Sequence, residues 1–511
     1  MSQQHGKRKA GAYRSAPSEP RAYARRLTHR AASPKPARNR TGTSPLSKPR
    51  IALDGYNLTL EQGTGIATYA RNLSYQLGAM GAEVGVLYGQ RAAASAKDDL
   101  LREVTLLDAK PRTTHPILRA IDDFQRGVKI SFGVTATSVP ITDRIIRRGI
   151  ESRIPYSNMA WNVPELFRAG ILGFGRAGRF GKVTLPDGPQ VMHWTYPLPL
   201  KVAGAKNIYT IHDLVPLRMP YATLDVKRRF LGTVREIVAN ADHIVTVSEA
   251  SKRDIITLLG AREDQVSCTY QAVELPAVLT QKPEALARAE VKGVFGLDWQ
   301  QYYFFFGAIE PKKNVSRLIE AHLASASPYP LVICGRQAWQ SKQELALLYE
   351  DDQRVMNDPG PPDGIQSLAR KLRGRVIMLE YAPFRLLVSL IRGARAVTFP
   401  SLYEGFGLPV LEAMLLGTPV MTANVASLPE VAGDAALLVD PYDTRAMAEA
   451  IQALDTNDGL RADLAARGPK QAAKFDSAAY GRRLSELYGR FGVEFPTPGI
   501  TRGPGPAPGA D

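Results

Sequence analysis

The sequence predicts an α/β protein built from two parallel-sheet domains. Short apolar stretches of strand length alternate with longer stretches whose apolar residues recur every three or four positions, which is the pattern of strand–helix–strand units. The alternation occurs in two series, beginning at Ile51 and at Tyr302. A length of 511 residues also allows two or three domains. We therefore expect two sheets that face each other across a cleft, an arrangement that suits an enzyme with two substrates.

The first series begins with a buried strand at Ile51–Asp54. A polar loop from Gly55 to Gly65 follows, and then a helix with Tyr69 and Leu77 among its apolar positions. Further strands are expected at 82–88, 207–211, 243–247 and 266–271, and further helices at 231–239 and 248–259. Residues 104–182 show no clear period and form a basic, insertion-like region.

The second series begins with the strand at 302–307. Further strands are expected at 331–334, 375–379, 396–400, 420–422 and 436–439, and helices at 315–323, 383–392, 409–416, 443–454 and 476–491. Gly417 is expected to end the helix at 409–416. We expect a first domain over 51–280, a second over 281–475, and a closing helix over 476–493 that packs back on the first domain.

The two ends of the chain differ in composition from the rest. Residues 1–50 hold 13 Lys or Arg and one acid, and residues 494–511 form a Pro/Gly-rich tail. Both are expected to be disordered. The formal net charge is +16, with +12 in residues 1–50, +8 in residues 110–182 and −4 in the remainder. Because residues 1–50 lack regularly spaced aromatic residues, no nucleic-acid partner is expected.

The cysteines, the apolar runs and the N-terminal residues indicate the cellular compartment of the protein. Cys268 and Cys334 are the two cysteines of the chain and stand in apolar, strand-like contexts, so a disulfide framework is excluded. The longest apolar run, around Tyr302–Ile309, is of strand length, which is too short to cross a bilayer. The N-terminus lacks the apolar core of a secretory signal. We expect a cytoplasmic protein, with peripheral association with the inner face of the membrane as the alternative.

The most informative stretch is Phe399–Glu412, with the sequence FPSLYEGFGLPVLE. A predicted strand ends at Pro400, a glycine-flanked loop follows, and Pro409 stands at the first helical position, which proline favours. Free N–H groups and the helix dipole at such a junction favour a phosphate. Glu404 on the loop and Glu412 on the first helical turn have the spacing E-x7-E, and paired carboxylates suit the hydroxyl groups of a sugar. The alternative is that both carboxylates are merely solvated beside a tight turn.

Five stretches in a fixed order carry a resemblance to a known family. They are GTGIATYARNL at 63–73, YTIHDLVPLRMP at 209–220, HIVTVSEASKRDI at 243–255, FGAIEPKKNVSRLIEAH at 306–322 and SLYEGFGLPVLEAM at 401–414. The chain resembles the retaining, nucleotide-sugar-dependent glycosyltransferases of family four, from about residue 51 to about residue 491. Their two Rossmann-like domains form the GT-B fold.

The resemblance implies roles for the residues of the E-x7-E stretch. Glu412 is implied to bind the ribose hydroxyls of the donor nucleotide, and Glu404 to lie near the hydroxyls of the donor sugar. The backbone of Phe406, Gly407 and Leu408 is implied to meet sugar or phosphate.

Two basic residues are assigned to the donor diphosphate. Lys313 matches the family's lysine at this position, and a fixed cation stabilises the negative charge that grows on a diphosphate leaving group. Many relatives carry an arginine directly after the glycine that matches Gly307, where this chain has Ala308. Arg336 follows another predicted strand end and is a candidate replacement. The alternatives are a solvated helix start for Lys313 and a surface arginine for Arg336.

The first domain contributes two further candidates. His212 ends a predicted strand, and the resemblance implies that it assists the transition state through a hydrogen bond to the sugar. Asp213 either orients His212 or caps the next helix. Gly65, in the loop Gly63-Thr64-Gly65, is implied to close over the donor phosphate or the acceptor, and the alternative is a turn with Thr64 as the helix cap.

The resemblance also implies a mechanism. No carboxylate is an evident counterpart of the nucleophile that retaining hydrolases use, so same-face attack is implied, with the diphosphate oxygen taking the acceptor's proton. No metal-ligand cluster such as D-x-D stands out, so we expect metal-independent transfer. No cofactor is expected beyond the nucleotide-sugar donor. GDP-mannose is favoured because the Glu-Pro-Lys-Lys-Asn motif is typical of a mannosyltransferase-like branch.

The acceptor is expected to be a glycan or a lipid-linked molecule used in polysaccharide biosynthesis. Residues 110–182 mix cations with aromatic residues, which suits an anionic membrane surface or a lipid-linked diphosphate. The residues concerned are Arg147, Arg148, Trp161, Phe167 and Arg168. A solvated insertion without a partner is the alternative. From another class, a non-catalytic GT-B scaffold or carbohydrate-binding protein is the competing function.

Overall fold

The computed structural model describes residues 48–58, 65–91, 98–107, 116–142, 154–348 and 374–496. The expected disorder of residues 1–50 therefore falls almost wholly outside the described residues. Arg50 is an exception, because it is the first residue of strand β1 (Arg50–Asp54) and not part of a tail. Phe495 likewise corrects the expected start of the C-terminal tail, because its ring packs edge-on against Tyr488 at 5.9 Å between centroids.

The N-terminal sheet has eight strands in the order β11-β10-β9-β7-β1-β2-β5-β4. All neighbours pair in parallel except β4 and β5, which are antiparallel. Beyond β1 the strands are β2 (Glu83–Tyr88), β4 (Thr137–Val139), β5 (Met159–Asn162), β7 (Val191–Trp194), β9 (Lys206–Thr210), β10 (His243–Thr246) and β11 (Val266–Cys268). A second, small parallel sheet has the order β3-β6-β8, with β3 at Val134–Thr135, β6 at Gly181–Thr184 and β8 at Leu200–Val202.

The helices of this half connect successive strands, as in other parallel sheets. They are α1 (Gly65–Ala79), α2 (Asp99–Leu107), α3 (Pro116–Phe132), α4 (Leu166–Ala177), α5 (Val215–Arg218), α6 (Lys227–Asn240) and α7 (Glu249–Leu259). Ser248 caps α7 as expected, because its hydroxyl accepts a hydrogen bond from the N–H of Ser251 at 3.0 Å. Helices α2 to α4 occupy the stretch in which the sequence shows no period.

The C-terminal sheet has six strands in the order β14-β13-β12-β15-β16-β17, all parallel. The strands are β12 (Tyr303–Phe306), β13 (Leu331–Cys334), β14 (Val376–Leu379), β15 (Ala396–Phe399), β16 (Val420–Ala423) and β17 (Leu437–Val439). The helices are α8 (Ala277–Thr280), α9 (Glu284–Phe295), α10 (Val315–Ala324), α11 (Ser341–Glu344), α14 (Phe384–Gly393), α15 (Leu408–Leu415), α16 (Leu428–Ala432), α17 (Thr444–Thr456) and α18 (Asp458–Ala472). The two sheets confirm the expected fold class.

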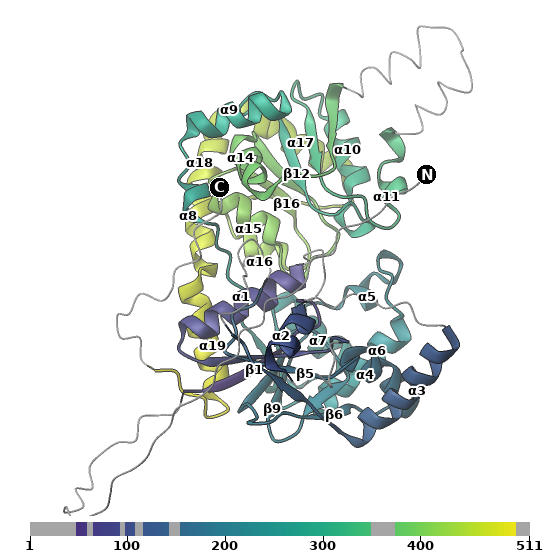
Figure 1. Cartoon of the computed structure of the whole chain (residues 1–511). Coiled ribbons are helices and arrows are strands. Elements are labelled where there is room, and N and C mark those ends of the chain that lie inside the picture. The colour runs from purple at the N-terminus through teal and green to yellow at the C-terminus, as the bar shows by residue number, and fades with distance from the viewer. Residues whose placement is uncertain are drawn as a thin grey trace, which may run out of the picture. The chain divides into compact units, whose positions relative to one another are not determined.

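The last helix, α19 (Ser477–Gly489), returns to the N-terminal sheet and lies beside α1 (Figure 1). The Tyr488 hydroxyl lies 2.6 Å from Nδ1 of His193, which is fully buried on β7. Nε2 of the same imidazole lies 2.7 Å from the Thr210 hydroxyl, which is 3.0 Å from the hydroxyl of Tyr69. A buried chain of polar side chains thus ties α19 to β7, β9 and α1.

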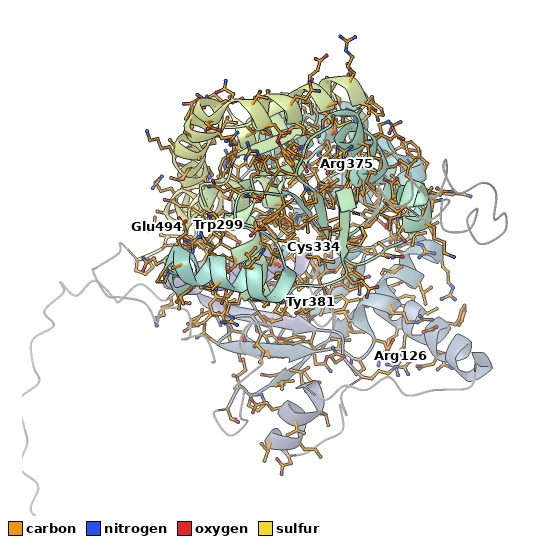
Figure 2. All side chains as sticks on the ribbon, turned by 90° about the horizontal axis from the view of Figure 1, so that it is seen from above. Arg126, Trp299, Cys334, Arg375, Tyr381 and Glu494 are labelled. Atoms are coloured by element: carbon orange, nitrogen blue, oxygen red, sulfur yellow. The ribbon has the colours of Figure 1, made fainter. Side chains whose placement is uncertain are left out.

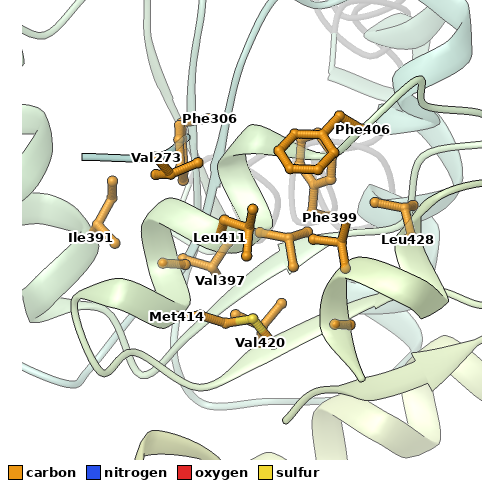
Figure 3. Close-up of a cluster of buried hydrophobic side chains, with 14 of the residues drawn as sticks. Val273, Phe306, Ile391, Val397, Phe399, Phe406, Leu411, Met414, Val420 and Leu428 are labelled. Carbon is orange, nitrogen blue, oxygen red and sulfur yellow. The ribbon is translucent and has the colours of Figure 1, made fainter. Parts of the chain in front are cut away.

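Continuous apolar runs explain the buried strands. All four residues of β12, β13 and β15 are buried, as expected of strands covered on both faces. Figure 3 shows the core beneath the E-x7-E loop, where Phe399, Phe406, Leu411 and Leu428 gather. Figure 2 labels Cys334, which is buried at the end of β13 and is a free thiol, as is Cys268.

The structure corrects the expected membrane-facing residues in the stretch 110–182. Trp161 and Phe167 are only 2% and 7% exposed and belong to the core of the N-terminal half. Arg168 forms an ion pair with Asp123 at 2.6 Å. Arg147 and Arg148 lie outside the described residues. Among the helices that the structure describes, none combines the length and the apolar character that a membrane span requires.

Candidate active site

The site candidates of the two halves meet where β9 and β15 end. His212 and Asp213 follow β9, and the loop containing Glu404 and Gly405 follows β15. A Cβ atom at Gly405 would lie 2.9 Å from the Asp213 Oδ2 atom and 3.0 Å from the His212 carbonyl oxygen. Only glycine permits so close an approach, so the sequence brings the E-x7-E loop directly against the His212 segment.

The lysines are presented by a short turn after β12. Pro311–Lys313 forms one turn of 3-10 helix, and Asn314 ends it in the left-handed region with φ 60°, which asparagine tolerates better than most residues. The Asn314 amide donates to the carbonyl groups of Pro400 at 3.1 Å and Pro441 at 2.7 Å. The hydrogen bonds of Asn314 therefore hold the turn of the Glu-Pro-Lys-Lys-Asn motif so that both lysines lie beside the end of β15.

Lys313 and Glu404 are joined directly. The Lys313 Nζ atom lies 2.5 Å from Glu404 Oε1, and both side chains are about nine-tenths buried. Nζ also lies 4.8 Å from the centroid of the Phe399 ring, so the cation is further stabilised by the aromatic face. Burial pushes the pKa of Glu404 upward, but Lys313 and Lys312 outweigh this effect and hold its pKa below the ordinary value.

Lys312 is a second cation of the site. Burial alone would lower its pKa, but the charges of Glu404, Glu310 and Asp213 dominate and raise it. Its Nζ atom lies 3.4 Å from Glu310 Oε1. Lys312 is thus held charged beside the Lys313–Glu404 pair, at the end of β15, where a diphosphate would need compensation.

The start of α15 is shaped for a close approach by a ligand. Gly407 is the N-cap residue with φ 114°, a conformation that glycine adopts readily. The Ser427 hydroxyl lies 2.9 Å from the Glu404 carbonyl and 2.7 Å from the Phe406 carbonyl, which fixes the loop. No hydrogen bond from the N–H groups of Gly407 or Leu408 to another described residue is present. These groups are available to a ligand oxygen at a helix N-terminus.

Glu412 stands on the second turn of α15 and not on the first, because the helix begins at Leu408. Burial raises the pKa of its carboxyl to about 7. Within the described residues no hydrogen bond or ion pair reaches this carboxylate. The residue is half-buried, so its carboxylate is partly withdrawn from water and can still accept hydrogen bonds from the hydroxyl groups of a ligand. As expected, the helix is ended by Gly417, whose φ is 71°.

The imidazole of His212 is held from two sides. Nε2 lies 2.9 Å from the carbonyl oxygen of Thr195, and the ring packs edge-on against Tyr69 at 4.7 Å between centroids. Because a carbonyl only accepts, Nε2 carries the proton. Burial lowers the pKa of His212, so the ring is neutral and Nδ1 keeps its lone pair. His212 can therefore accept a hydrogen bond from a hydroxyl.

A residue outside the expected set supports this geometry. Asp54, fully buried at the end of β1, accepts hydrogen bonds from the N–H of Thr195 and, at 3.2 Å, from that of Tyr56. Burial raises the pKa of Asp54 to about 6. The carboxylate thus binds the N–H of Thr195, the residue whose carbonyl oxygen orients His212. The only sequence signal was an acidic residue at the end of a buried strand.

The structure also places three other residues of the expected site, namely Asp213, Arg336 and Gly65. Asp213 accepts a hydrogen bond from the N–H of Val215, the first residue of α5, at 3.0 Å, although Leu214 occupies the N-cap position of that helix. His212 is oriented by Thr195. Arg336 is exposed and follows Gly335, whose Cβ position would lie 1.8 Å from the Gly307 carbonyl oxygen. Gly65 is the first residue of α1, whereas Gly63 and Thr64 lie outside the described residues.

Two polar contacts hold the halves together beside the site. The Glu430 carboxylate accepts from the N–H groups of Glu249 and Ala250, both at 3.0 Å, and so caps α7. The Tyr403 hydroxyl donates to Asp254, which also pairs with the guanidinium of Arg218. Tyr403 precedes Glu404, so this second contact anchors the loop that carries the candidate residue.

The described part of the chain contains no group of three or more His, Cys, Asp or Glu side chains arranged to hold a metal ion. The chemistry that the arrangement supports is the binding of an anionic, hydroxyl-rich molecule by two lysines, helix N–H groups and a buried carboxylate.

Comparison with known families covers both halves. Residues 134–275 match the family described as Glycosyltransferase Family 4, and residues 290–471 match the family described as Glycosyl transferases group 1. The second match contains the lysine turn, the loop after β15 and α15.

Curated relatives are similar over part of the chain. O-antigen chain mannosyltransferase B of Escherichia coli is 33% identical over 275 residues, which is 53% of this chain and 66% of that protein. The serotype-specific mannosyltransferase WbdA of Escherichia coli is 28% identical over 56% of this chain and 33% of its own length. A D-inositol 3-phosphate glycosyltransferase of Mycobacteroides abscessus is 27% identical over 76% of this chain and 87% of its own length. Relative to the two mannosyltransferases, the chain thus spans about two thirds and one third of their lengths.

Solved structures share the fold. Sucrose-phosphate synthase from Thermosynechococcus elongatus superposes with a TM-score of 0.56 at 19% identity, covering 87% of this chain and 100% of the other. Anabaena HepE in complex with UDP-glucose gives a TM-score of 0.54 at 15% identity, covering 86% and 99%. The two family matches lie in order along the chain, which therefore carries a family 4 glycosyltransferase domain followed by a group 1 glycosyltransferase domain and shares the fold of these structures.

Proposed function

We propose that this chain transfers mannose from GDP-mannose to a glycan or a lipid-linked acceptor in polysaccharide biosynthesis, with retention of configuration and without a metal ion. The observation that supports the proposal is the close approach of the loop that carries the Lys313–Glu404 pair to the His212 segment, with the unpartnered Glu412 on the helix that follows the loop. Mannose is favoured because the relatives O-antigen chain mannosyltransferase B and WbdA are mannosyltransferases by name.

The reaction breaks the bond between the sugar C1 atom and the diphosphate oxygen, and forms a bond from C1 to the acceptor oxygen on the same face. The acceptor's proton passes to the departing diphosphate oxygen, so atoms and charges balance without a separate base. Lys313 and Lys312 stabilise the charge that develops on the leaving group, as fixed cations in a dry site do best. The Nδ1 lone pair of His212 accepts from a sugar hydroxyl and orients the ring.

A donor screen tests the proposal. The thermal midpoint of the full chain is measured with GDP-mannose, UDP-glucose and ADP-glucose, and the release of free nucleotide is followed for each. We expect stabilisation and turnover with GDP-mannose above the other two. Preference for another donor would refute the choice of sugar, and the absence of any response would refute glycosyl transfer in favour of a non-catalytic scaffold.

Variants and product analysis test the mechanism. Lys313→Ala should lower kcat by at least about a hundredfold, on the order of an oxyanion contact, whereas the exposed control Lys342→Ala should not. Arg336→Ala should weaken donor binding several-fold, and an unchanged donor affinity would remove it from the site. The anomeric configuration of the product, read by NMR, decides retention. Activity that EDTA abolishes would contradict the metal-independent reaction.

A further inference from the structure

Helix α3 carries an apolar stripe on its outer side. Phe124, Val128 and Phe132 are 54%, 43% and 85% exposed, and their spacing of four residues places them on one face of the helix. Helix α3 lies beside α4 and β6 (Figure 1). Isolated exposed apolar residues are ordinary, but a stripe with two phenylalanines on one helix marks an interaction surface.

The inner side of α3 explains why this face is turned outward. A Cβ atom at Gly173 of α4 would lie 2.8 Å from the Gly127 carbonyl oxygen, so the two helices cross at a pair of glycines. Ile130 is buried, and Asp123 pairs with Arg168 of α4. These contacts fix the rotation of α3 and leave the side chains of Phe124, Val128 and Phe132 exposed.

Exposed cations lie on α3 and on the segments that pack against it. Lys129 on α3, Arg179 after α4 and Lys182 on β6 are exposed, and the Arg176 guanidinium lies 5.1 Å from the centroid of the Phe124 ring. The two acids in the described part of α3 do not offset them, because Asp122 pairs with Arg126 at 2.7 Å and Asp123 with Arg168. Figure 2 labels Arg126 on this helix.

We infer that the α3 face, defined as Phe124, Val128 and Phe132 with Lys129, Arg176, Arg179 and Lys182, binds the surface of a bilayer that contains anionic phospholipid. Apolar side chains that reach the acyl region beside cations at headgroup level are the features of an interfacial helix. A nucleic acid would leave the apolar stripe exposed, and an acidic protein is a possible partner that the experiment distinguishes. The inference deepens the proposed function by naming the surface at which a lipid-linked acceptor is met.

Insertion is measured first, with the full chain and no donor or acceptor. A tryptophan is introduced as Phe132→Trp and, as a control on α9, as Leu286→Trp, where the native side chain is 58% exposed. Vesicles of phosphatidylcholine with 30% phosphatidylglycerol carry brominated acyl chains, which quench only a tryptophan that enters the membrane. We expect quenching of the emission added at 132 and none at 286, relative to the parent chain. No quenching at 132 would overturn the inference, because binding through other basic residues does not insert this face.

Affinity is measured by co-sedimentation with the same vesicles lacking bromine. The variant F124S/V128S/F132S should bind at least about tenfold more weakly, and K129A/R179A/K182A likewise at 0.1 M salt, since one cation near an anionic surface is worth about a fivefold change. The matched control V278S/L286S/V294S replaces three exposed apolar residues elsewhere and should bind within twofold of the parent.

Two further results complete the test. Light scattering without lipid should give the same mass for the parent chain and for F124S/V128S/F132S; a dimer that this variant dissociates would assign the stripe to a second copy and overturn the membrane inference. Nucleotide release with a water-soluble acceptor should be unchanged in the same variant. A failure of vesicle binding therefore leaves the proposed transfer intact, and a failure of transfer leaves vesicle binding measurable.

Discussion

Glu412 is expected to give donor binding a pH dependence. Its side chain is half-buried, and its carboxyl has no hydrogen-bond or ion-pair partner among the described residues and a pKa raised to about 7. Only the carboxylate accepts hydrogen bonds at both oxygens from a pair of ribose hydroxyls. Donor affinity should therefore rise as the pH rises through 7, while the nucleotide sugar itself carries no group that titrates in this window.

The size of the effect follows from the ionised fraction. With a pKa of about 7, about a tenth of the molecules carry the carboxylate at pH 6 and about nine tenths at pH 8. Since an apparent Kd is the intrinsic value divided by the competent fraction, donor binding should be about tenfold weaker at pH 6 than at pH 8. Glu412→Gln keeps the shape but loses one acceptor and the charge, so at pH 8 it should bind about tenfold or more weakly, as for a hydrogen bond to a charged group.

Calorimetric titration of GDP-mannose at pH 6, 7 and 8 measures both quantities. The variant should show a flat profile between pH 6 and 8, whereas the parent should not. A slope of equal size in the two proteins would refute the reasoning, since the titrating group would then lie elsewhere.

The same carboxyl makes an independent prediction for stability without donor. Its pKa in the folded chain lies above the ordinary value of 4.5, so the folded state holds the proton more tightly than the unfolded state. Stability is then fully present below pH 4.5 and is lost as the pH rises to about 7, by at most about 3 kcal/mol. At pH 8 Glu412→Gln should therefore unfold at a higher denaturant concentration than the parent while binding donor more weakly. A variant of equal or lower stability would contradict the assigned burial cost.

Three further predictions concern the framework of the site. Gly405→Ala places a Cβ atom against Asp213 and the His212 carbonyl and should lower kcat at least tenfold with an unchanged circular dichroism spectrum. The control Gly175→Ala, where nothing lies within 4 Å of the added Cβ atom, should retain activity. Equal rates for the two variants would show that the loop does not approach the His212 segment this closely. Asp54→Ala leaves the N–H of Thr195 without its acceptor and should lower kcat about tenfold with the donor KM unchanged. Asp54→Asn should restore part of this kcat, and an effect on KM alone would exclude a positioning role for Asp54. Tyr488→Phe removes a buried hydrogen bond to His193 and should cost about 1–2 kcal/mol of unfolding free energy, and a smaller loss in denaturant titration would argue against the polar chain beneath α19.

Much of the fold could be predicted because buried parallel strands appear in the sequence as continuous apolar runs. The strand expected at 331–334 has those bounds, and the strands around Phe305 and Phe399 differ from expectation by one or two residues. Helix α4 could not be recognised because its glycines, among them Gly173, have low intrinsic helix propensity. Those glycines are explained only by the crossing with α3, which is a long-range contact. Helix α18 was missed for a related reason, since Pro469 lies inside it.

The sequence allowed the types of residue in the site to be predicted, but not which side chains pair with one another. Lys313 and Glu404 were expected near different parts of the donor, and their ion pair spans 91 positions of the chain. The bond from Thr195 to Asp54 spans 141 positions. Neither pairing leaves a local pattern, because each arises where separate strands end at one edge of a sheet. Resemblance supplied Glu404 and Glu412, whereas only the geometry reveals Lys312 as a cation held by three carboxylates.

The two halves divide the chemistry in a way that makes each depend on the other. The C-terminal half holds the two lysines and Glu412, the groups to which the proposed function assigns the nucleotide sugar. His212, with its proton fixed on Nε2 by Thr195, comes from the N-terminal half and meets the loop only because Gly405 lacks a side chain. Donor binding should therefore tolerate changes at Asp54 that transfer does not. A separation of kcat from donor affinity along this line would show that the meeting of the two strand ends, rather than the donor pocket alone, makes the chain a catalyst.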